Sequence, residues 1–450
     1  MEPEELLSIA ETTLKKVKLD EAECYVSWEQ TTEAKIDGGI PSFAQHEIAG
    51  IGIRGVIGKK VGFTSVSSID PIQIERAAQR CFEIVRKTPE DPDFHHLPDP
   101  VPAKNKRASI WDENIASYDS LMKDCRVMAD KAKSKRIVYV ITNASTSLNA
   151  YAVANTRGIG ICEKGTGIYY SVWCKAKSGN EEKFGCNTAE SRQLITPVDG
   201  ALASEGAREC LGGRALEQPE KGDVVFDPFT LGEAGFGLLS MLDHGISARE
   251  VQEHRSALEG KIEEPVASKI SIIDDGRLQS GLRTRGYDDE GVPTTRKSII
   301  EDGILKTYLY DSYCAHREGM KSSGNGMRIG MLDDTDRFSR LPGVKPTNYV
   351  IEPTCQKNLE GLIEGIDHGL LVRYLLMGVL HANQVTGDFS IVAPSALMID
   401  HGEIAYPLKP VTLAGNFYEM LKQIKAVGKD KWLCKTGLVS SMVAGGITYS

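Results

Sequence analysis

The stretch V-V-F-D-P-F-T-L-G-E-A-G-F-G-L-L-S-M-L (Val224–Leu242) combines two patterns that decide how the second half of the chain is read. Its first part, Val224–Phe229, is a short apolar run typical of a buried strand. Its second part, Leu231–Leu242, is predicted to open an amphipathic helix. Glu233 lies inside that predicted helix, among glycines at positions 232, 235 and 237. We therefore expect a new domain to begin just before this stretch, with Glu217–Asp223 as the boundary.

The patterns on either side of this boundary predict an α+β protein of two domains. A chain of 450 residues is long enough to bury a large core and to form two units. Residues 1–216 are predicted to form a domain of helices and antiparallel sheet, and residues 223–450 a mostly β domain. A helix followed by strands occurs twice within residues 1–216, which suggests an internal duplication.

The individual elements follow from apolar spacing, capping residues and alternation. In the first domain, helices are predicted at Pro3–Val17, Asp70–Lys87, Tyr118–Ser134 and Pro197–Gly212, and strands at Glu21–Glu29, Thr32–Asp37, Gly50–Ile57 and Ile137–Thr146. The prolines of Pro89–Pro102 predict an irregular connection. In the second domain, strands are predicted at Lys269–Ile273 and Lys306–Tyr310, and helices at Leu231–Leu242, Leu359–Asp367 and Gly415–Val427.

Composition and charge exclude several classes of function. The formal net charge of -9 argues against nucleic acid as the main partner, because phosphate binding needs a basic surface. No apolar run reaches the roughly 18 residues that a membrane helix needs. The acidic start M-E-P-E-E-L-L lacks the pattern of a signal peptide. We therefore expect a cytoplasmic protein.

The ten cysteines form no C-x-x-C pair and are expected to be reduced thiols packed as small apolar groups.

Five segments of the second half occur in an order and spacing that identify a family. They are G-Y-D-D-E-G-V-P-T-T-R (Gly286–Arg296), S-I-I-E-D-G-I-L-K-T-Y-L-Y-D-S-Y (Ser298–Tyr313), E-G-M-K-S-S-G-N-G (Glu318–Gly326), N-Q-V-T-G-D-F-S (Asn383–Ser390) and I-A-Y-P-L-K-P-V-T-L-A-G-N (Ile404–Asn416). Together they resemble the C-terminal domain of the TldD/PmbA (TldE) family. The family pairs two related subunits: TldD carries an H-E-x-x-x-H metal site, and TldE/PmbA has lost it.

The resemblance predicts a role for the segment around Glu233, which corresponds to the metal site of the family. In an H-E-x-x-x-H helix, two imidazoles bind zinc and the glutamate between them activates water. Here G-E-A-G-F-G keeps Glu233 and places Gly232 and Gly237 where the two histidines would stand. The family's third zinc ligand is a cysteine near T-G-D-F, and Met377–Val385 contains none. The chain is thus similar to the TldE/PmbA branch, and the resemblance implies that it holds no metal or other cofactor.

The resemblance implies a metal-free, non-catalytic subunit of a heterodimeric metallopeptidase that degrades or processes unfolded peptides. Zinc is then expected in the TldD-like partner subunit. The alternative is a stand-alone homodimeric peptide-binding protein without a protease partner. A third reading is an autonomous hydrolase that uses other residues. Whether the chain forms a homodimer in isolation stays open.

Four residues are candidates for a shared cavity or a dimer contact: Arg296, Asn325, His381 and Asp388. Their segments are polar and turn-like, so core packing alone does not account for them. His381 is also the best remaining candidate for a metal ligand. Glu233 could act as a base, but it has no metal or histidine neighbour to work with, and an acid near a helix N-terminus is the simpler reading.

The acids of Asp288-Asp289-Glu290 resemble paired catalytic carboxylates. They precede a glycine, however, where aspartate is common because it forms local hydrogen bonds in turns. A turn is therefore the expected role of this triplet.

Overall fold

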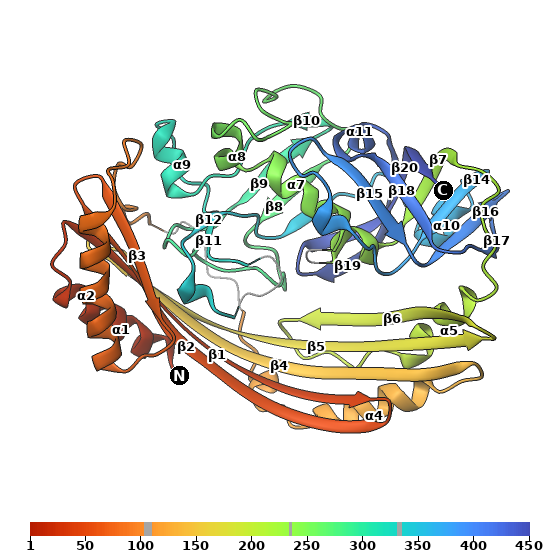
Figure 1. Ribbon diagram of the computed structural model, residues 1–450, viewed down its shortest axis with the longest axis horizontal. Coiled ribbons are helices and arrows are strands. Elements are labelled where there is room, and N and C mark those ends of the chain that lie inside the picture. Colours follow the sequence, from red (N-terminus) through yellow and green to blue (C-terminus); the bar gives the residue numbers. More distant parts are fainter. Residues whose placement is uncertain (103–109, 234–235, 331–334) are drawn as a thin grey trace.

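A computed structural model describes residues 1–102, 110–233, 236–330 and 335–450. It consists of an N-terminal sheet domain and a mostly β C-terminal part, which confirms the predicted α+β class (Figure 1). The C-terminal part lies on the concave side of the long, curved first sheet (Figure 1). Within the described residues, no helix is both long and apolar enough to cross a membrane.

The N-terminal sheet has six antiparallel strands in the order β3-β2-β1-β4-β5-β6. Their bounds are β1 Glu21–Asp37, β2 Ile40–Ile57, β3 Lys60–Val66, β4 Ile137–Asn155, β5 Gly160–Ser178 and β6 Glu181–Ser191. The helices of this domain are α1 Pro3–Lys16, α2 Pro71–Lys87, α3 Glu113–Ala116, α4 Leu121–Ala132 and α5 Gly200–Glu209. Four of them pack on the outer face of the sheet, where α1 and α2 cover one apolar cluster and α4 and α5 cover another.

The sheet order is symmetric about the pair of central strands β1 and β4. On each side, the chain runs from a helix through three strands to a second helix: α1, β1 to β3 and α2, and then α4, β4 to β6 and α5. A duplicated unit would produce this arrangement. The chain passes from the first sheet to the second after α5, which ends at Glu209, and the next strand begins at Glu220. The domain boundary at Glu217–Asp223 stays a prediction.

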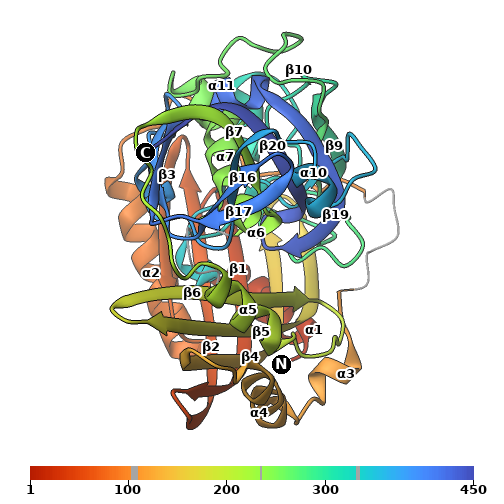
Figure 2. The same cartoon turned by 90° about the vertical axis from the view of Figure 1, so that its right-hand side faces the viewer.

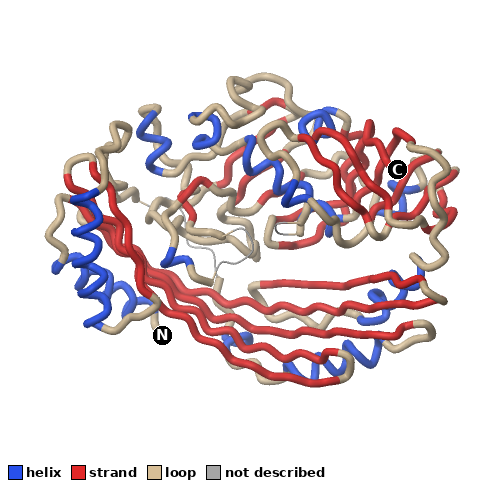
Figure 3. Tube along the Cα trace, in the orientation of Figure 1, coloured by secondary structure: helices blue, strands red, loops and turns tan. Residues whose placement is uncertain are grey.

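The C-terminal sheet is built around β20 (Gly437–Tyr449), which pairs with the preceding strand in a hairpin and with three further strands from earlier in the chain. Figure 2 shows β5 and β6 of the first sheet running beneath this part, and Figure 3 shows how few residues of the C-terminal part are helical. The other strands of this sheet are β7 Glu220–Phe226, β8 Ile272–Asp275, β9 Arg296–Glu301, β10 Ile304–Leu305, β13 Tyr349–Ile351, β14 His368–Val372, β15 Asp388–Ala393, β16 Ala396–Asp400, β17 Glu403–Pro407, β18 Val411–Asn416 and β19 Ile424–Cys434. β11 Gly326–Met327 and β12 Gly343–Val344 pair as a separate two-stranded sheet.

The C-terminal part also has short helices, most of which pack on its sheet, whereas Phe338 of the one at Arg337–Ser339 packs on the first sheet. They are α6 Pro228–Gly232, η1 Leu238–Met241, α7 Leu242–Gly245, α8 Ala248–Gln252, α9 Ser312–Arg317, η2 Arg337–Ser339, α10 Leu359–Ile363, η3 Val379–His381 and α11 Phe417–Lys422. All ten cysteines lie in described residues and all are free thiols, as expected.

Three predicted elements of the C-terminal part are wrong. The helix predicted for Leu231–Leu242 is broken into three short pieces, as described below. Lys306–Tyr310 is not a strand and forms only an isolated bridge at Leu309. The helix predicted for Gly415–Val427 is reduced to α11, because β18 runs to Asn416 and β19 starts at Ile424. Asn416 ends the strand by capping the helix, since its side chain accepts from the backbone N–H groups of Tyr418 and Glu419.

Candidate functional site

The segment around Glu233 is a break between helices. Asp227 caps the start of α6, and its carboxylate accepts a hydrogen bond from the Thr230 backbone N–H at 2.8 Å. The chain leaves the helix at Glu233, which has an extended backbone (φ -63°, ψ 129°). Gly237 is extended as well, and η1 starts only after it. Glycine is a weak helix former, and this stretch carries three, which explains why the apolar pattern did not give a continuous helix. Ala234 and Gly235 lie outside the described residues.

The two glycines of the frame leave no room for larger side chains. A Cβ atom at Gly232 would lie 2.7 Å from Cys434 Sγ and 3.0 Å from a methyl group of Val439. A Cβ atom at Gly237 would lie 2.3 Å from the backbone carbonyl oxygen of Leu231. Histidine at either position would therefore collide with groups that pack there now. A zinc ion held in the H-E-x-x-x-H manner does not fit this frame. Across the described ranges, no group of three His, Cys, Asp or Glu side chains is placed to hold a metal ion.

Glu233 is mostly buried between the two sheets and is surrounded by residues of both. Burial, together with the nearby Glu190 of β6, raises its pKa to about 7, against an opposing effect of Lys435. The pKa of Tyr169 on β5 is raised to about 12, mainly by burial and partly by Glu233 and Glu190. Glu233 is thus a carboxyl that exchanges its proton near neutral pH, with a second acid close by and without a histidine or metal site beside it in the described part of the chain.

The raised pKa of Glu233 gives a testable dependence of stability on pH. In the folded state the pKa of Glu233 is about 7, whereas in the unfolded state it is the usual 4.5. Between these two pH values the folded state therefore keeps a proton that the unfolded state releases. Wild-type stability should therefore fall as the pH rises through this window. Glu233→Gln removes the effect, so its free energy of unfolding relative to wild type should rise by about 1–2 kcal/mol between pH 5 and pH 8. Urea titrations at both values measure this. Glu83→Gln, on the exposed face of α2, is the control; a Glu233→Gln difference as flat with pH as the control would refute the assignment.

The segment Gly286–Arg296 docks the C-terminal part onto the concave face of the first sheet through buried ion pairs. Arg54 of β2 donates to Glu23 of β1 at 2.6 Å and to Glu290 at 3.2 Å. Glu23 also accepts from Arg328 Nη2 at 2.5 Å. Glu23 has no exposed surface, and Arg328 and Glu290 are each 1% exposed. Two arginines and two glutamates from distant parts of the sequence thus form one enclosed network.

A second layer of contacts surrounds Asp289. Its carboxylate accepts from the hydroxyl of Tyr25 at 3.0 Å, from Arg285 Nη1 at 2.5 Å and from the backbone N–H of Arg328 at 2.6 Å. The Arg328 guanidinium also lies over the Tyr25 ring, 4.8 Å from its centroid. Asp288 does form the expected turn, by accepting from backbone N–H groups of Glu290 and Val292. The acidic triplet therefore shapes a turn and also fastens two parts of the chain together.

Comparisons with known proteins identify the family and agree with this fold. Residues 219–450 match the PmbA/TldA metallopeptidase C-terminal domain, and residues 22–85 match PmbA/TldA metallopeptidase domain 1. The chain belongs to the PmbA/TldD family. An uncharacterized protein of Methanocaldococcus jannaschii is 28% identical over 392 residues, 86% of each sequence. A Buchnera aphidicola (Schizaphis graminum) metalloprotease TldD homolog is 26% identical over 86% of this chain and 80% of its own length. The crystal structure of TldE from Thermococcus kodakarensis shares the fold, with a TM-score of 0.84, 23% identity and 99% of each chain covered.

The four polar candidates of this PmbA/TldD-family chain fall into two groups. Asn325 has no exposed surface, and its amide donates to Asp274 Oδ2 and to the Lys345 carbonyl oxygen, both at 2.9 Å. It holds loops of its own chain together, and its contribution to a shared cavity or a dimer contact stays a prediction. Arg296 lies nearby on β9, where its exposed guanidinium is 3.7 Å from Asp275 and 3.5 Å from Glu352.

His381 and Asp388 form the second group, at the start of β15. His381 is exposed at the end of η3. Asp388 is also exposed, and hydrogen bonds from Thr386 and Asn416 lower its pKa. The backbone carbonyl of Asp388 accepts from Asn383 N–H at 2.9 Å, which closes the loop after His381. Both side chains are thus available to an incoming molecule, and their roles stay predictions.

Sequence reasoning missed Glu23, Arg54 and Arg328, the partners of the acidic triplet. Arg54 and Glu23 lie in strands, where a charged residue on an alternating pattern normally faces water. The alternation of residues along β1 and β2 could have identified Glu23 and Arg54. It places both side chains on the face of the sheet that the helices do not cover. That face would be exposed if the domain stood alone, and the C-terminal part covers it here.

Proposed function

We propose that this chain is the metal-free, non-catalytic subunit of a PmbA/TldD-type metallopeptidase, and that it works with a zinc-carrying TldD-type partner on unfolded peptides. The observation that carries the proposal is the packing at Gly232 and Gly237, where neighbouring atoms fill the space that two ligand side chains would need. A subunit that keeps the family fold without the metal ligands would serve through its surface, which can bind the partner or the peptide.

An unpaired apolar strand edge supports a role in assembly. β1 pairs with the whole length of β2, whereas β3 pairs only with Ile51–Ile57. In the described part of the chain, no strand pairs with the other edge of residues 40–49. Ile40 is 73% exposed there and Phe43 is 63% exposed. Natural proteins usually cover or charge such edges, because they pair readily with another chain.

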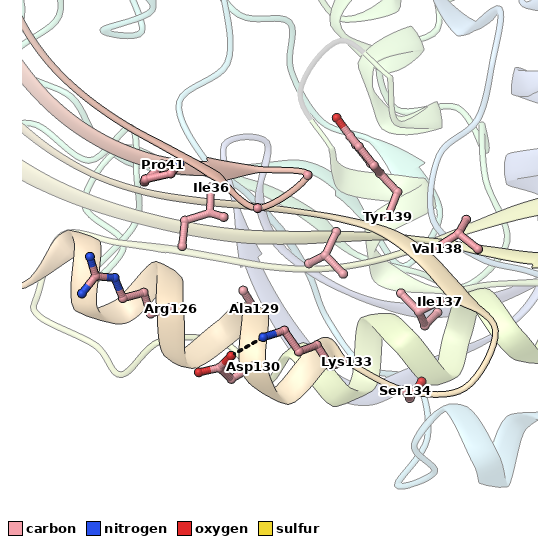
Figure 4. Close-up of a pocket in the computed structure, with 13 residues that line it drawn as sticks. Ile36, Pro41, Arg126, Ala129, Asp130, Lys133, Ser134, Ile137, Val138 and Tyr139 are labelled. Atoms are coloured by element: carbon pink, nitrogen blue, oxygen red, sulfur yellow. Dashed lines mark hydrogen bonds and ion pairs between the residues drawn. The ribbon is translucent and has the colours of Figure 1, made fainter.

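A shallow pocket extends this apolar surface at the same end of the sheet (Figure 4). It lies between the β1–β2 hairpin tip, α4 and the start of β4, and has a volume of about 590 Å³. Tyr139 points away from α4 in Figure 4, and Val138 beside it is largely exposed. The wall also carries polar side chains, among them Arg126 and the ion pair between Asp130 and Lys133 on α4. A stable interface buries roughly 1,200 Å² or more in total. The exposed hairpin and the adjacent pocket would form part of such an interface with a partner chain.

The metal-free part of the proposal has a direct test. Elemental analysis of the chain, purified without added metal and dialysed against a chelator, should find far less than one zinc or iron per chain, because the described residues offer no three-ligand site. The control is His381→Ala, which removes the best remaining candidate ligand and should change nothing. About one tightly held zinc per wild-type chain, lost in His381→Ala, would overturn this part of the proposal.

A further inference from the structure

A small pocket lies between the two parts of the chain, beside the helix α6 that leads to Gly232 and Glu233. It has a volume of about 280 Å³. One side comes from β6 and α5 of the N-terminal domain, and the other from α6, the segment after β14 and β19. Both sides must stay docked for the pocket to exist.

Aromatic rings form one wall of this pocket. Phe229 of α6 and Trp432 of β19 have ring centroids 5.5 Å apart and tilted by 42°. Trp173 of β5 packs edge-on against Phe229 at 6.4 Å from behind. Both Phe229 and Trp432 line the pocket and are partly exposed. Faces of this kind attract cations through the ring quadrupole.

The charged groups of the lining favour the same class of ligand. Three acids line the pocket: Glu205 and Glu209 on α5, and the buried Asp227. The one cation among the described lining residues is Arg373, and its Nη1 is 3.1 Å from Glu209 Oε2. Three carboxylates against one guanidinium leave an excess of negative charge once that pair is formed. A cation is attracted to such a site and an anion is repelled.

An unpartnered hydroxyl completes the site. Tyr374 is 8% exposed, yet no hydrogen-bond partner reaches its hydroxyl in the described structure. The hydroxyl lies against Gly206 of α5, where even a methyl group would collide with it, and both residues line the pocket. Tyr374 also has a positive φ of 66°, a strained conformation for a bulky residue. Its backbone N–H donates to Asp227 at 3.2 Å. A buried acceptor without a donor and a strained backbone together are typical of a binding site.

We propose that this pocket binds the positively charged group of a peptide, either a lysine or arginine side chain or an N-terminal ammonium. The ammonium would donate to the Tyr374 hydroxyl and lie over Phe229 and Trp432, with Glu205 and Asp227 supplying the opposite charge. The inference rests on the proposed function in that the ligand is a peptide. It adds that the peptide presents a cation to this subunit.

The test measures binding to the full-length chain alone, by tryptophan fluorescence and NMR titration. The probes are acetyl-Ala-Lys-Ala-amide, the same peptide with norleucine or glutamate in place of lysine, and Ala-Ala-Ala-amide with a free N-terminus. The lysine peptide or the free-amine peptide should bind about tenfold more tightly than the norleucine peptide, as expected for one cation–π contact with an opposite charge. The tighter of the two identifies the source of the cation.

Two variants and a control make the test specific. Tyr374→Phe removes a hydroxyl that has no hydrogen-bond partner among the described residues, so it should leave the thermal unfolding midpoint unchanged and weaken binding of the cationic peptide several-fold. Glu205→Gln should weaken it similarly, and the exposed Glu83→Gln should not. Equal binding of the lysine, free-amine and norleucine peptides would overturn the inference, as would binding unaffected by both pocket variants. Because no partner subunit is present, this result is separate from whether mixing with a partner gives activity.

Discussion

Replacing Glu23 with glutamine is expected to lower the free energy of unfolding by about 3–5 kcal/mol, the cost of leaving buried charges without a partner. The change keeps the size and shape of the side chain, so no cavity is formed. It removes the charge that both Arg54 and Arg328 contact, at 2.6 and 2.5 Å. Only Glu290 would then face Arg54, and Arg328 would keep no carboxylate from this network. Urea titration of the variant and the wild type measures the loss.

The matched control is Glu264→Gln. Glu264 pairs with Lys261 at 2.8 Å, but its side chain is 51% exposed, and such pairs contribute about 0–1 kcal/mol. Hydrogen exchange should show where the loss acts: amides of Gly286–Val292 and of β1 should exchange faster in Glu23→Gln, since they lie at the docking surface. A loss no larger than that of Glu264→Gln would mean that the network does not hold the two parts together.

Much of the N-terminal domain could be predicted because its signals are local. Asp70 caps α2 and Pro71 occupies its first turn, and the helix runs from Pro71 to Lys87 as expected. α1 likewise ends within one residue of its predicted end. The strands predicted within β1, β2 and β4 are too short, and β3, β5 and β6 were not predicted. The long β1 continues through Gln30 and Thr31, where the alternation is weak, because β2 and β4 pair with it on both sides.

The C-terminal part was harder to predict because tertiary contacts decide its elements. Leu231–Leu242 has a helical apolar pattern, but Gly237 packs directly against the Leu231 carbonyl and the chain turns there. The turn at Asp288-Asp289-Glu290 was expected, whereas its ion pairs to β1 and β2 were not. Asp289 and Tyr25 lie 264 positions apart in the sequence, and no local pattern links them.

The second large effect concerns activity. Mixing this chain with its TldD-type partner should give peptidase activity that neither chain shows alone, at least about 100-fold above either, because the proposed catalytic metal and the proposed cavity wall are on different chains. Glu233→Ala in the mixed pair should leave activity within a few-fold, since no described group near Glu233 can hold a metal that would activate water. A loss of about 100-fold or more, as for a true catalytic base, would overturn the non-catalytic assignment.

Charge reversal of Asp388 tests the role of the exposed loop at β15. Its exposed carboxylate bonds to the side chains of Thr386 and Asn416 among the described residues, so Asp388→Lys should cost little stability. If the loop faces the shared cavity or the partner, the variant should weaken activity or assembly of the mixed pair. Lys422→Glu on α11, another exposed charge reversal, is the control and should do neither.

The measurement that tests the central claim most directly combines light scattering with hydrolysis of an unstructured peptide, on the two chains separately and mixed. The account predicts a 1:1 complex whose mass is the sum of the two chains and whose activity appears only on mixing. A partner that is fully active alone, with masses that do not add on mixing, would contradict it, and the stand-alone peptide-binding protein would take its place.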